Sequence, residues 1–222
     1  MHKVLDFIKK NKQFSFFLLL VILLALITIF APVIAPQDPY VSDLKNALQP
    51  PSSAHWFGTD KLGRDIFSRV IYASRSSLPA TLILVALIFV IGTLLGTLAG
   101  YFGGWIDAVI MRISDMMISF PGMVLAIAVA GIMGASVKNA VIAVAVVSWP
   151  KYARLARSLV MKIRHEDYIY AAIVTGSKTS YILRKYMLPN IIPTLIITAA
   201  TDIGGMMLEL AGLSFLGFGA KA

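Results

Sequence analysis

Long apolar stretches separated by short polar segments dominate this chain. The first runs from Phe14 to Ile34 without a charge and, at about 1.5 Å per helical residue, spans roughly 30 Å, the thickness of a bilayer core. Uncharged stretches also occupy residues 76–106, 116–137 and 139–150, and an apolar stretch at 189–216 holds two carboxylates. The pattern predicts an all-α integral membrane protein with five transmembrane helices.

The polar segments suggest how the chain is placed in the membrane. Residues 1–13 are predicted to be a cytoplasmic N-terminus before a first transmembrane helix at 14–34. A basic start before an apolar run is also typical of a cleaved signal peptide, but this run exceeds the roughly 7–15 residues of such a segment. Residues 35–77 have nearly balanced charge and are predicted to form a periplasmic or extracellular loop. Residues 78–222 would form the transmembrane core.

The loop contains a run of polar residues that allows two interpretations. His55, Asp60 and Asp65 are the residue types of an acid–base catalyst. No nucleophile or metal-ligand spacing accompanies them, so an ordered loop of paired charges and glycine turns is the favoured interpretation. A membrane enzyme is therefore the weakest of the functional alternatives.

Composition narrows the class of protein. The chain is 58% hydrophobic and 14% charged with a mean hydropathy of +0.81, whereas soluble domains carry about a quarter charged residues. The net charge of +9 is attributed to cytoplasmic loops rather than to nucleic-acid binding. The absence of cysteine excludes disulfides and thiolate metal sites, and no histidine pair at ligand spacing predicts a metal site.

Basic residues concentrate in one segment late in the chain. Only Glu166 and Asp167 oppose the eight basic residues of 151–189, which places this segment in the cytoplasm by the positive-inside rule. The basic residues are Lys151, Arg154, Arg157, Lys162, Arg164, Lys178, Arg184 and Lys185. Lys151, Arg154 and Arg157 recur at every third residue, on a helix face expected to meet lipid headgroups or a partner.

Residues 164–189, called the elbow below, have the features of a helix, a turn and a second helix. Glu166 and Asp167 suit a helix N-terminus, where free N–H groups carry partial positive charge. Gly176 permits a turn with positive φ, and Ser177 is expected to cap a second short helix. Pro189 suits the first turn of the next apolar helix. Gly176-Ser-Lys-Thr resembles the end of a phosphate-binding loop but lacks its upstream glycine.

Small and acidic residues mark two of the apolar stretches. Gly92, Gly96 and Gly100 recur at every fourth residue, which predicts close helix packing, with pathway lining as the alternative. Asp202 and Glu209 lie seven residues apart and hence near one helix face. Carboxylates within a membrane usually face a cavity or a partner, so they are candidates for lining a pathway. The alternative places Glu209 at the outer interface.

Two methionines complete the candidate pathway set. Met206 and Met207 lie between the two carboxylates.

Three blocks of sequence resemble the second permease subunit of peptide- and nickel-type ABC importers. They are His55–Leu78, Gly100–Pro121 and the elbow, so the resemblance covers nearly the whole chain. The elbow resembles the permease signature Glu-Ala-Ala, three residues, Gly, and a Leu-Pro ending. The matching positions are Ala171, Ala172, Gly176, Leu188 and Pro189, whereas Tyr170 stands in place of the signature Glu.

The resemblance implies a mechanism and partners. It implies a type I ABC importer permease fold, with the elbow as the coupling helix seated in a cytoplasmic ATPase subunit. The partners would be a second permease, two ATP-binding subunits and an extracytoplasmic substrate-binding protein, in the plasma or inner membrane. ATP and Mg²⁺ would bind the partner subunits, leaving this chain without a cofactor or enzymatic site. The family also implies a sixth helix after Gly219, which the sequence lacks.

The sequence leaves two classes of substrate open, a metal ion and a peptide. The run Thr201–Gly217 is more similar to nickel-type members, so nickel, free or chelated, is the expected substrate and a di- or oligopeptide the alternative. A secondary transporter that works without ATP would leave the elbow unexplained. A membrane scaffold without a pathway is the other alternative, and it predicts that replacing Asp202 and Glu209 by alanine has no effect on transport.

Overall fold

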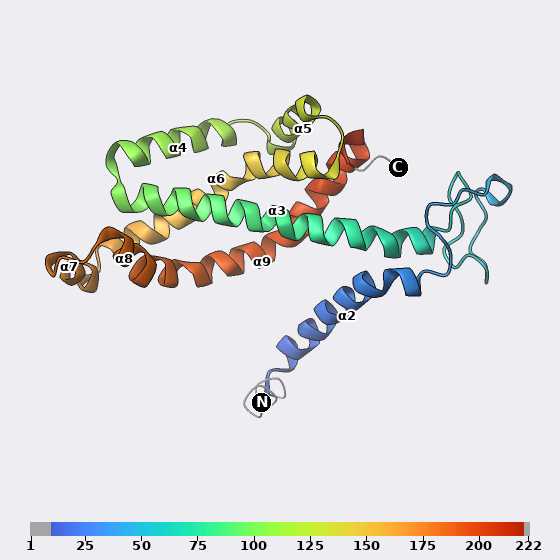
Figure 1. The fold of residues 1–222 in the computed structure, drawn as a ribbon, viewed down its shortest axis with the longest axis horizontal. Helices are drawn as coiled ribbons and strands as arrows, with labels where there is room; N and C mark the ends of the chain where they lie inside the picture. Colours follow the sequence, from blue (N-terminus) through green and yellow to red (C-terminus); the bar gives the residue numbers. More distant parts are fainter. Residues whose placement is uncertain (1–9, 220–222) are drawn as a thin grey trace. The chain divides into compact units, whose positions relative to one another are not determined.

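The computed structural model describes residues 10–219, which are mostly helical with a single isolated β-bridge. The long elements are α2 (Lys12–Ile34), α3 (Ile66–Phe102), α4 (Gly104–Ile118), α5 (Gly122–Met133), α6 (Val137–Arg164) and α9 (Leu188–Leu213) (Figure 1). The short elements are η1 (Leu44–Asn46), α7 (Asp167–Val174), α8 (Thr179–Ile182) and the π-helical turns η2 (Leu183–Met187) and η3 (Ser214–Phe218). The chain divides into two compact units, Met1–Leu78 and Pro79–Ala222.

Three helices of the described part are long and apolar enough to cross a membrane. They cover Lys12–Ile34, Ile66–Phe102 and Thr179–Phe218. A fourth crossing arises if α4 and α5, which meet at an angle of 93°, count as one span. Pro121 explains this break in the stretch 116–137, because the residue before a proline is disfavoured in a helix. The all-α prediction is confirmed for the described residues, whereas the count of five helices stays a prediction.

In the first unit, α2 begins two residues before the predicted start, and the first nine residues of the predicted cytoplasmic segment lie outside the described part. The predicted loop 35–77 is ordered but ends in helix, since α3 already begins at Ile66. Asp65 caps this helix by accepting a hydrogen bond from the Ser68 amide at 2.8 Å, and it contacts His55 Nδ1 at 3.0 Å. Burial opposes ionisation of Asp65, but these bonds hold its pKa below the usual range.

Asp60 organises the turn before this cap. Its carboxylate accepts hydrogen bonds from the amides of Leu62 and Arg64 and from the Arg64 guanidinium, at 2.8–3.0 Å. Despite the opposing effect of burial, these donors lower the pKa of Asp60. Gly63 has φ +74°, and a Cβ there would collide with the backbone of Asp43. The loop is thus one of paired charges and glycine turns, in which both acids have structural partners.

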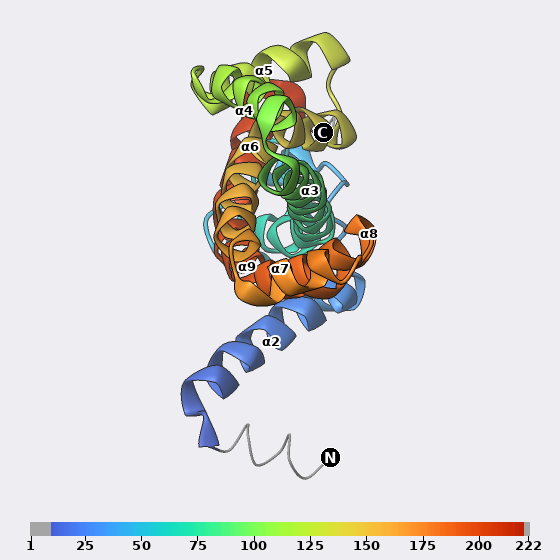
Figure 2. The same ribbon diagram turned by 90° about the vertical axis from the view of Figure 1, so that its left-hand side faces the viewer.

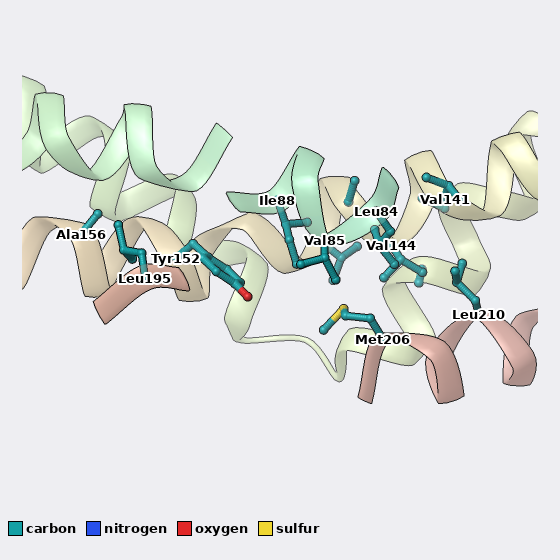
Figure 3. Close-up of a cluster of buried hydrophobic side chains, with 14 of the residues drawn as sticks. Leu84, Val85, Ile88, Val141, Val144, Tyr152, Ala156, Leu195, Met206 and Leu210 are labelled. Carbon is teal, nitrogen blue, oxygen red and sulfur yellow. The ribbon is translucent and has the colours of Figure 1, made fainter. Parts of the chain in front are cut away.

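The second unit packs α3, α6 and α9 around an apolar core. Leu84, Val85 and Ile88 of α3 lie opposite Val144 of α6 and Met206 of α9 (Figure 3). Lipid tails are as apolar as these side chains, so close van der Waals packing, rather than removal from water, stabilises this core within a membrane.

The three recurring glycines of α3 lie against α6. A Cβ at Gly92 would collide with Tyr152, and one at Gly96 with Ala153. A Cβ at Gly100 would lie 2.8 Å from the carbonyl oxygen of Arg157. The two backbones therefore approach each other along three turns because these positions carry no side chain.

Candidate functional site

The elbow lies at one end of the second unit, where α6 ends and α9 begins. Figure 2 views this end and shows α7 and α8 crossing it. Glu166 occupies the N-cap position of α7, and Asp167 lies in its first turn, as the sequence predicted. Gly176 follows α7 with φ +78°, the left-handed conformation expected of the turn.

The second short helix begins differently from the prediction. Lys178, not Ser177, is the N-cap of α8, so the capping role predicted for Ser177 is wrong. The Ser177 amide instead donates to the Ala172 carbonyl at 3.0 Å and closes the turn after α7. Because the Ser177 amide closes the C-terminus of α7, Ser177 belongs to the end of that helix, and α8 begins one residue later than predicted. Pro189 lies in the first turn of α9, as predicted.

Buried apolar side chains fix the elbow to the bundle. Ile169 and Ala172 of α7 are buried in the core, as are Ile182 and Met187 beyond the turn. Leu188, the first residue of α9, is partly buried against the same core. Ala172 therefore faces inward, whereas Ala171 is exposed. Of the two small residues in the signature, one packs within the chain and the other is open to a partner.

The outer face of α7 is largely apolar and open. Its exposed apolar residues are Tyr170, Ile173 and Val174, the last with 85% of its surface accessible, whereas Tyr168 packs against Tyr186 with ring centroids 6.0 Å apart. The Tyr170 hydroxyl lies 3.1 Å from His165 Nδ1, so the residue that replaces the signature Glu has a hydrogen-bond partner inside the elbow. Apolar side chains exposed together on a short helix are typical of a protein interface.

The basic face of α6 is paired within the chain. Each basic side chain contacts an acid of another helix: Lys151 with Asp202 of α9, and Arg154 and Arg157 with Asp115 and Asp107 of α4. The three side chains remain partly exposed, between 31% and 57%, so the expectation that this face meets lipid headgroups or a partner stays a prediction. The tertiary fold brings α4 and α9 to either side of α6, and their acids neutralise its charge.

Asp202 is held by two residues of α6. Lys151 Nζ donates to both carboxylate oxygens at 2.7 and 2.8 Å, and the Tyr152 hydroxyl donates at 3.0 Å. Tyr152 is fully buried beside Gly92, which fixes the direction of its hydroxyl. Sequence reasoning missed both partners. The sequence signal that could have identified Lys151 is its position directly after Pro150, as the first charged residue after a short apolar stretch.

The other candidate pathway residues lie along the same helix. Met206 is buried in the core, and Met207 and Glu209 are half-buried. Among residues 10–219, no group of three or more acidic or histidine side chains is arranged to hold a metal ion.

Two family descriptions match the sequence. Residues 92–221 match the binding-protein-dependent transport system inner membrane component, and residues 2–51 match the N-terminal transmembrane domain of oligopeptide transport permease C. The first covers more than half of the chain.

Individual relatives are similar over most of their length. The dipeptide transport system permease protein DppC of Alkalihalophilus pseudofirmus is 44% identical over 97% of this chain and 71% of the relative. The probable D,D-dipeptide transport system permease protein DdpC of Escherichia coli is 45% identical over 91% of this chain and 68% of its own length. The nickel transport system permease protein NikC of Escherichia coli is 39% identical over 92% and 74%.

A solved structure extends the similarity to the fold. The inward-facing MetNI methionine ABC transporter contains a chain that superposes with a TM-score of 0.58 at 22% identity, over 65% of this chain and 73% of the other. The all-α arrangement is thus the type I ABC importer permease fold. The chain belongs to the family of binding-protein-dependent transport system inner membrane components, as a permease of the peptide/nickel group of ABC importers.

Proposed function

We propose that this chain is the permease subunit of an ATP-driven importer of di- or oligopeptides, and that the elbow couples it to the ATPases. The exposed apolar face of α7, on a helix whose opposite face is buried in the bundle, is the observation that carries the coupling assignment. A surface of this kind suits a groove in a cytoplasmic ATPase subunit.

The connections of the elbow suit the transmission of force. α6 leads into α7, and α9 follows it after only α8 and η2, so a displacement of α7 acts on two long helices at once. The buried Ile169 and Ala172 keep α7 from moving independently of the bundle. In this proposal ATP binding draws two ATPase subunits together, and the elbows of this permease and a second permease follow. The cavity between the permeases then opens to a substrate-binding protein on the outer side.

The substrate assignment favours peptides over nickel. The polar groups at the middle of α6 and α9 include both signs of charge, which suits the two charged ends of a peptide. Relatives named as dipeptide permeases support the same assignment, and the relative named as a nickel permease keeps nickel as the alternative.

The remaining roles follow from the same proposal. Asp202, Met207 and Glu209 would line the pathway, whereas Met206, predicted with them, packs in the core between the helices. ATP and Mg²⁺ would bind the partner ATPase subunits, and this chain would need no cofactor. The N-terminus and the elbow would both lie in the cytoplasm, since basic residues concentrate there.

Uptake by the reconstituted complex tests the substrate. Proteoliposomes with both permeases, both ATPases and the binding protein are given a radiolabelled dipeptide or radiolabelled nickel, with and without ATP. ATP-dependent uptake of the peptide alone is the expected result. Uptake of nickel alone would overturn the peptide assignment, and uptake driven by an ion gradient without ATPases would overturn the ABC mechanism.

Crosslinking tests the contact with the ATPase. The chain has no native cysteine, so Val174→Cys is a single-cysteine variant without background reaction. We expect this variant to crosslink to an ATPase subunit. Ile132→Cys is the matched control, because Ile132 is equally exposed on α5, at the opposite end of the second unit from α7 (Figure 1). Equal crosslinking of both variants would refute the assignment of α7.

A further inference from the structure

The pairing of α6 with α9 leaves a lysine ammonium accessible midway along both helices. Lys151 Nζ contacts both oxygens of Asp202, yet 57% of the Lys151 side chain is exposed, against 12% for Asp202. A lysine ammonium has three donors, and the contacts with Asp202 occupy two of them. Within the pair, Asp202 is therefore covered by protein, whereas the Lys151 ammonium is accessible to a further ligand.

The depth of this pair decides what it faces. Lys151 lies near the middle of α6 and Asp202 near the middle of α9, so each lies roughly 20 Å from the elbow at 1.5 Å per residue. That distance corresponds to the interior of a bilayer. An exposed ammonium at this depth is unfavourable against lipid and is found facing a water-filled cavity or a partner. The open side of Lys151 thus belongs to the transport pathway.

A second charge lies further along the same helix. Glu209 is two turns beyond Asp202 on nearly the same face of α9, roughly 10 Å along the axis. It is half-buried and forms no direct hydrogen bond or ion pair with residues 10–219, although the charges of Asp202 and Lys151 both act on it. The two helices accordingly present a cationic group at one level and a carboxylate without a direct ion pair at the other.

We propose that Lys151 and Glu209 hold the two ends of a zwitterionic peptide during its passage. This inference rests on the proposed peptide substrate. The Lys151 ammonium binds the C-terminal carboxylate, and the Glu209 carboxylate binds the N-terminal ammonium. An extended chain spans about 3.3–3.6 Å per residue, so the rise of roughly 10 Å from the level of the Lys151–Asp202 pair to that of Glu209 suits a peptide of two or three residues with its charged ends directed to the helices.

Asp202 and Tyr152 act as positioning residues in this arrangement. The Tyr152 hydroxyl fixes the Asp202 carboxylate, which in turn holds the Lys151 ammonium toward the pathway when no peptide is present. A peptide carboxylate then meets a preoriented ammonium whose charge is already shared with Asp202. Such a contact is weak enough to release, which transport requires.

Photolabelling of the assembled wild-type complex tests the orientation. A tripeptide with a diazirine in its C-terminal residue is expected to label α6 around Lys151. The same tripeptide with the diazirine in its N-terminal residue is expected to label α9 around Glu209. Labelling of one region by both probes, or of neither region by either, would overturn the proposal.

A charge exchange separates substrate binding from structural pairing. We expect Lys151→Gln to lower the initial rate of peptide uptake at least tenfold in complexes that still contain all of the subunits. The double variant Lys151→Asp with Asp202→Lys restores an ion pair, but we expect it not to restore uptake, because the charge offered to the peptide is inverted. Recovery of uptake would show that the pair only joins the helices and would overturn the proposal.

Arg154→Gln provides the matched control. Arg154 also joins α6 to an acid of a neighbouring helix, at 2.6 Å from Asp115, but it lies outside the proposed binding face. We expect its uptake to stay within twofold of wild type. An equal loss in the Arg154 and Lys151 variants would overturn the specific role of Lys151. Absence of peptide uptake by the wild-type complex would instead refute the proposed function itself.

Discussion

Gly96→Ala is predicted to destabilise the helix bundle although alanine is the better helix former. The added Cβ would overlap the Ala153 carbonyl oxygen and lie 2.8 Å from the Ala156 Cβ. Carbon atoms in contact prefer about 3.5–4.0 Å, so α3 and α6 would have to separate by roughly 0.7 Å or more. Both obstacles are parts of α6 that no side-chain rotation can move away.

The magnitude follows from two opposing effects. Replacing glycine by alanine within a helix gains about 1 kcal/mol. Overpacking a close contact costs about 1–3 kcal/mol, and the loss of neighbouring core contacts adds to this as the helices separate. We therefore expect a net destabilisation of about 1–2 kcal/mol, which is roughly a 5- to 30-fold change in the unfolding equilibrium.

Unfolding by sodium dodecyl sulfate measures this difference. It is followed by circular dichroism and by the fluorescence of the three tryptophans, of which Trp149 lies beside Gly92. Gly204→Ala is the matched control. Gly204 lies within a long helix as well, but nothing lies within 4 Å of a Cβ built there. We expect the control to match or exceed wild-type stability. The reasoning about close packing fails if Gly96→Ala is as stable as Gly204→Ala.

Three further predictions address the elbow, the loop and the ion pairs. Gly176→Leu places a branched side chain at φ +78°, which costs about 1–2 kcal/mol of strain; we expect ATP-driven uptake to be lost while membrane insertion, followed by protease accessibility, is retained. Because folding lowers the pKa of Asp65 below its usual value of 3.8, the ionised Asp65 stabilises the fold above that pH, and this stabilisation is lost as the pH falls through the folded-state pKa. Thermal melting at a series of pH values should show the loss. Asp65→Asn should abolish this pH dependence and lower the stability of the fold by about 1–2 kcal/mol. A double-mutant cycle of Asp107→Asn and Arg157→Gln should give a coupling of about 1 kcal/mol, and additive effects would contradict the paired geometry.

Local sequence patterns predicted much of the elbow and little of its surroundings. The acids at positions 166 and 167, the positive φ at Gly176 and the proline at position 189 each follow from the preferences of single residues at helix ends and turns. Ser177 was assigned to the wrong helix because two neighbouring helix ends compete for the same residue. Which end prevails depends on the hydrogen bond that closes the turn after α7.

The charges of α6 show where sequence reasoning stopped. Their spacing indicated one helix face, but nothing local identified Asp107, Asp115 and Asp202 as the partners of that face. These acids are distant in sequence, and only the packing of α4 and α9 beside α6 brings them within reach. The same packing brings the Tyr152 hydroxyl to the Asp202 carboxylate, which it orients by a hydrogen bond.

The sequence by itself determined that this protein is helical and crosses a membrane, and the resemblance of its elbow to a permease signature indicated its class. Hydrophobicity, charge asymmetry and turn chemistry act over a few neighbouring residues, so they can be read along the chain. The tertiary structure decided that the basic face of α6 is paired, that the face of α7 bearing Ala171 is open while Ala172 is buried, and that Lys151 is accessible beside Asp202. Pairing and burial depend on which helices lie side by side, and this is fixed by close contacts such as those of Gly92, Gly96 and Gly100 against α6.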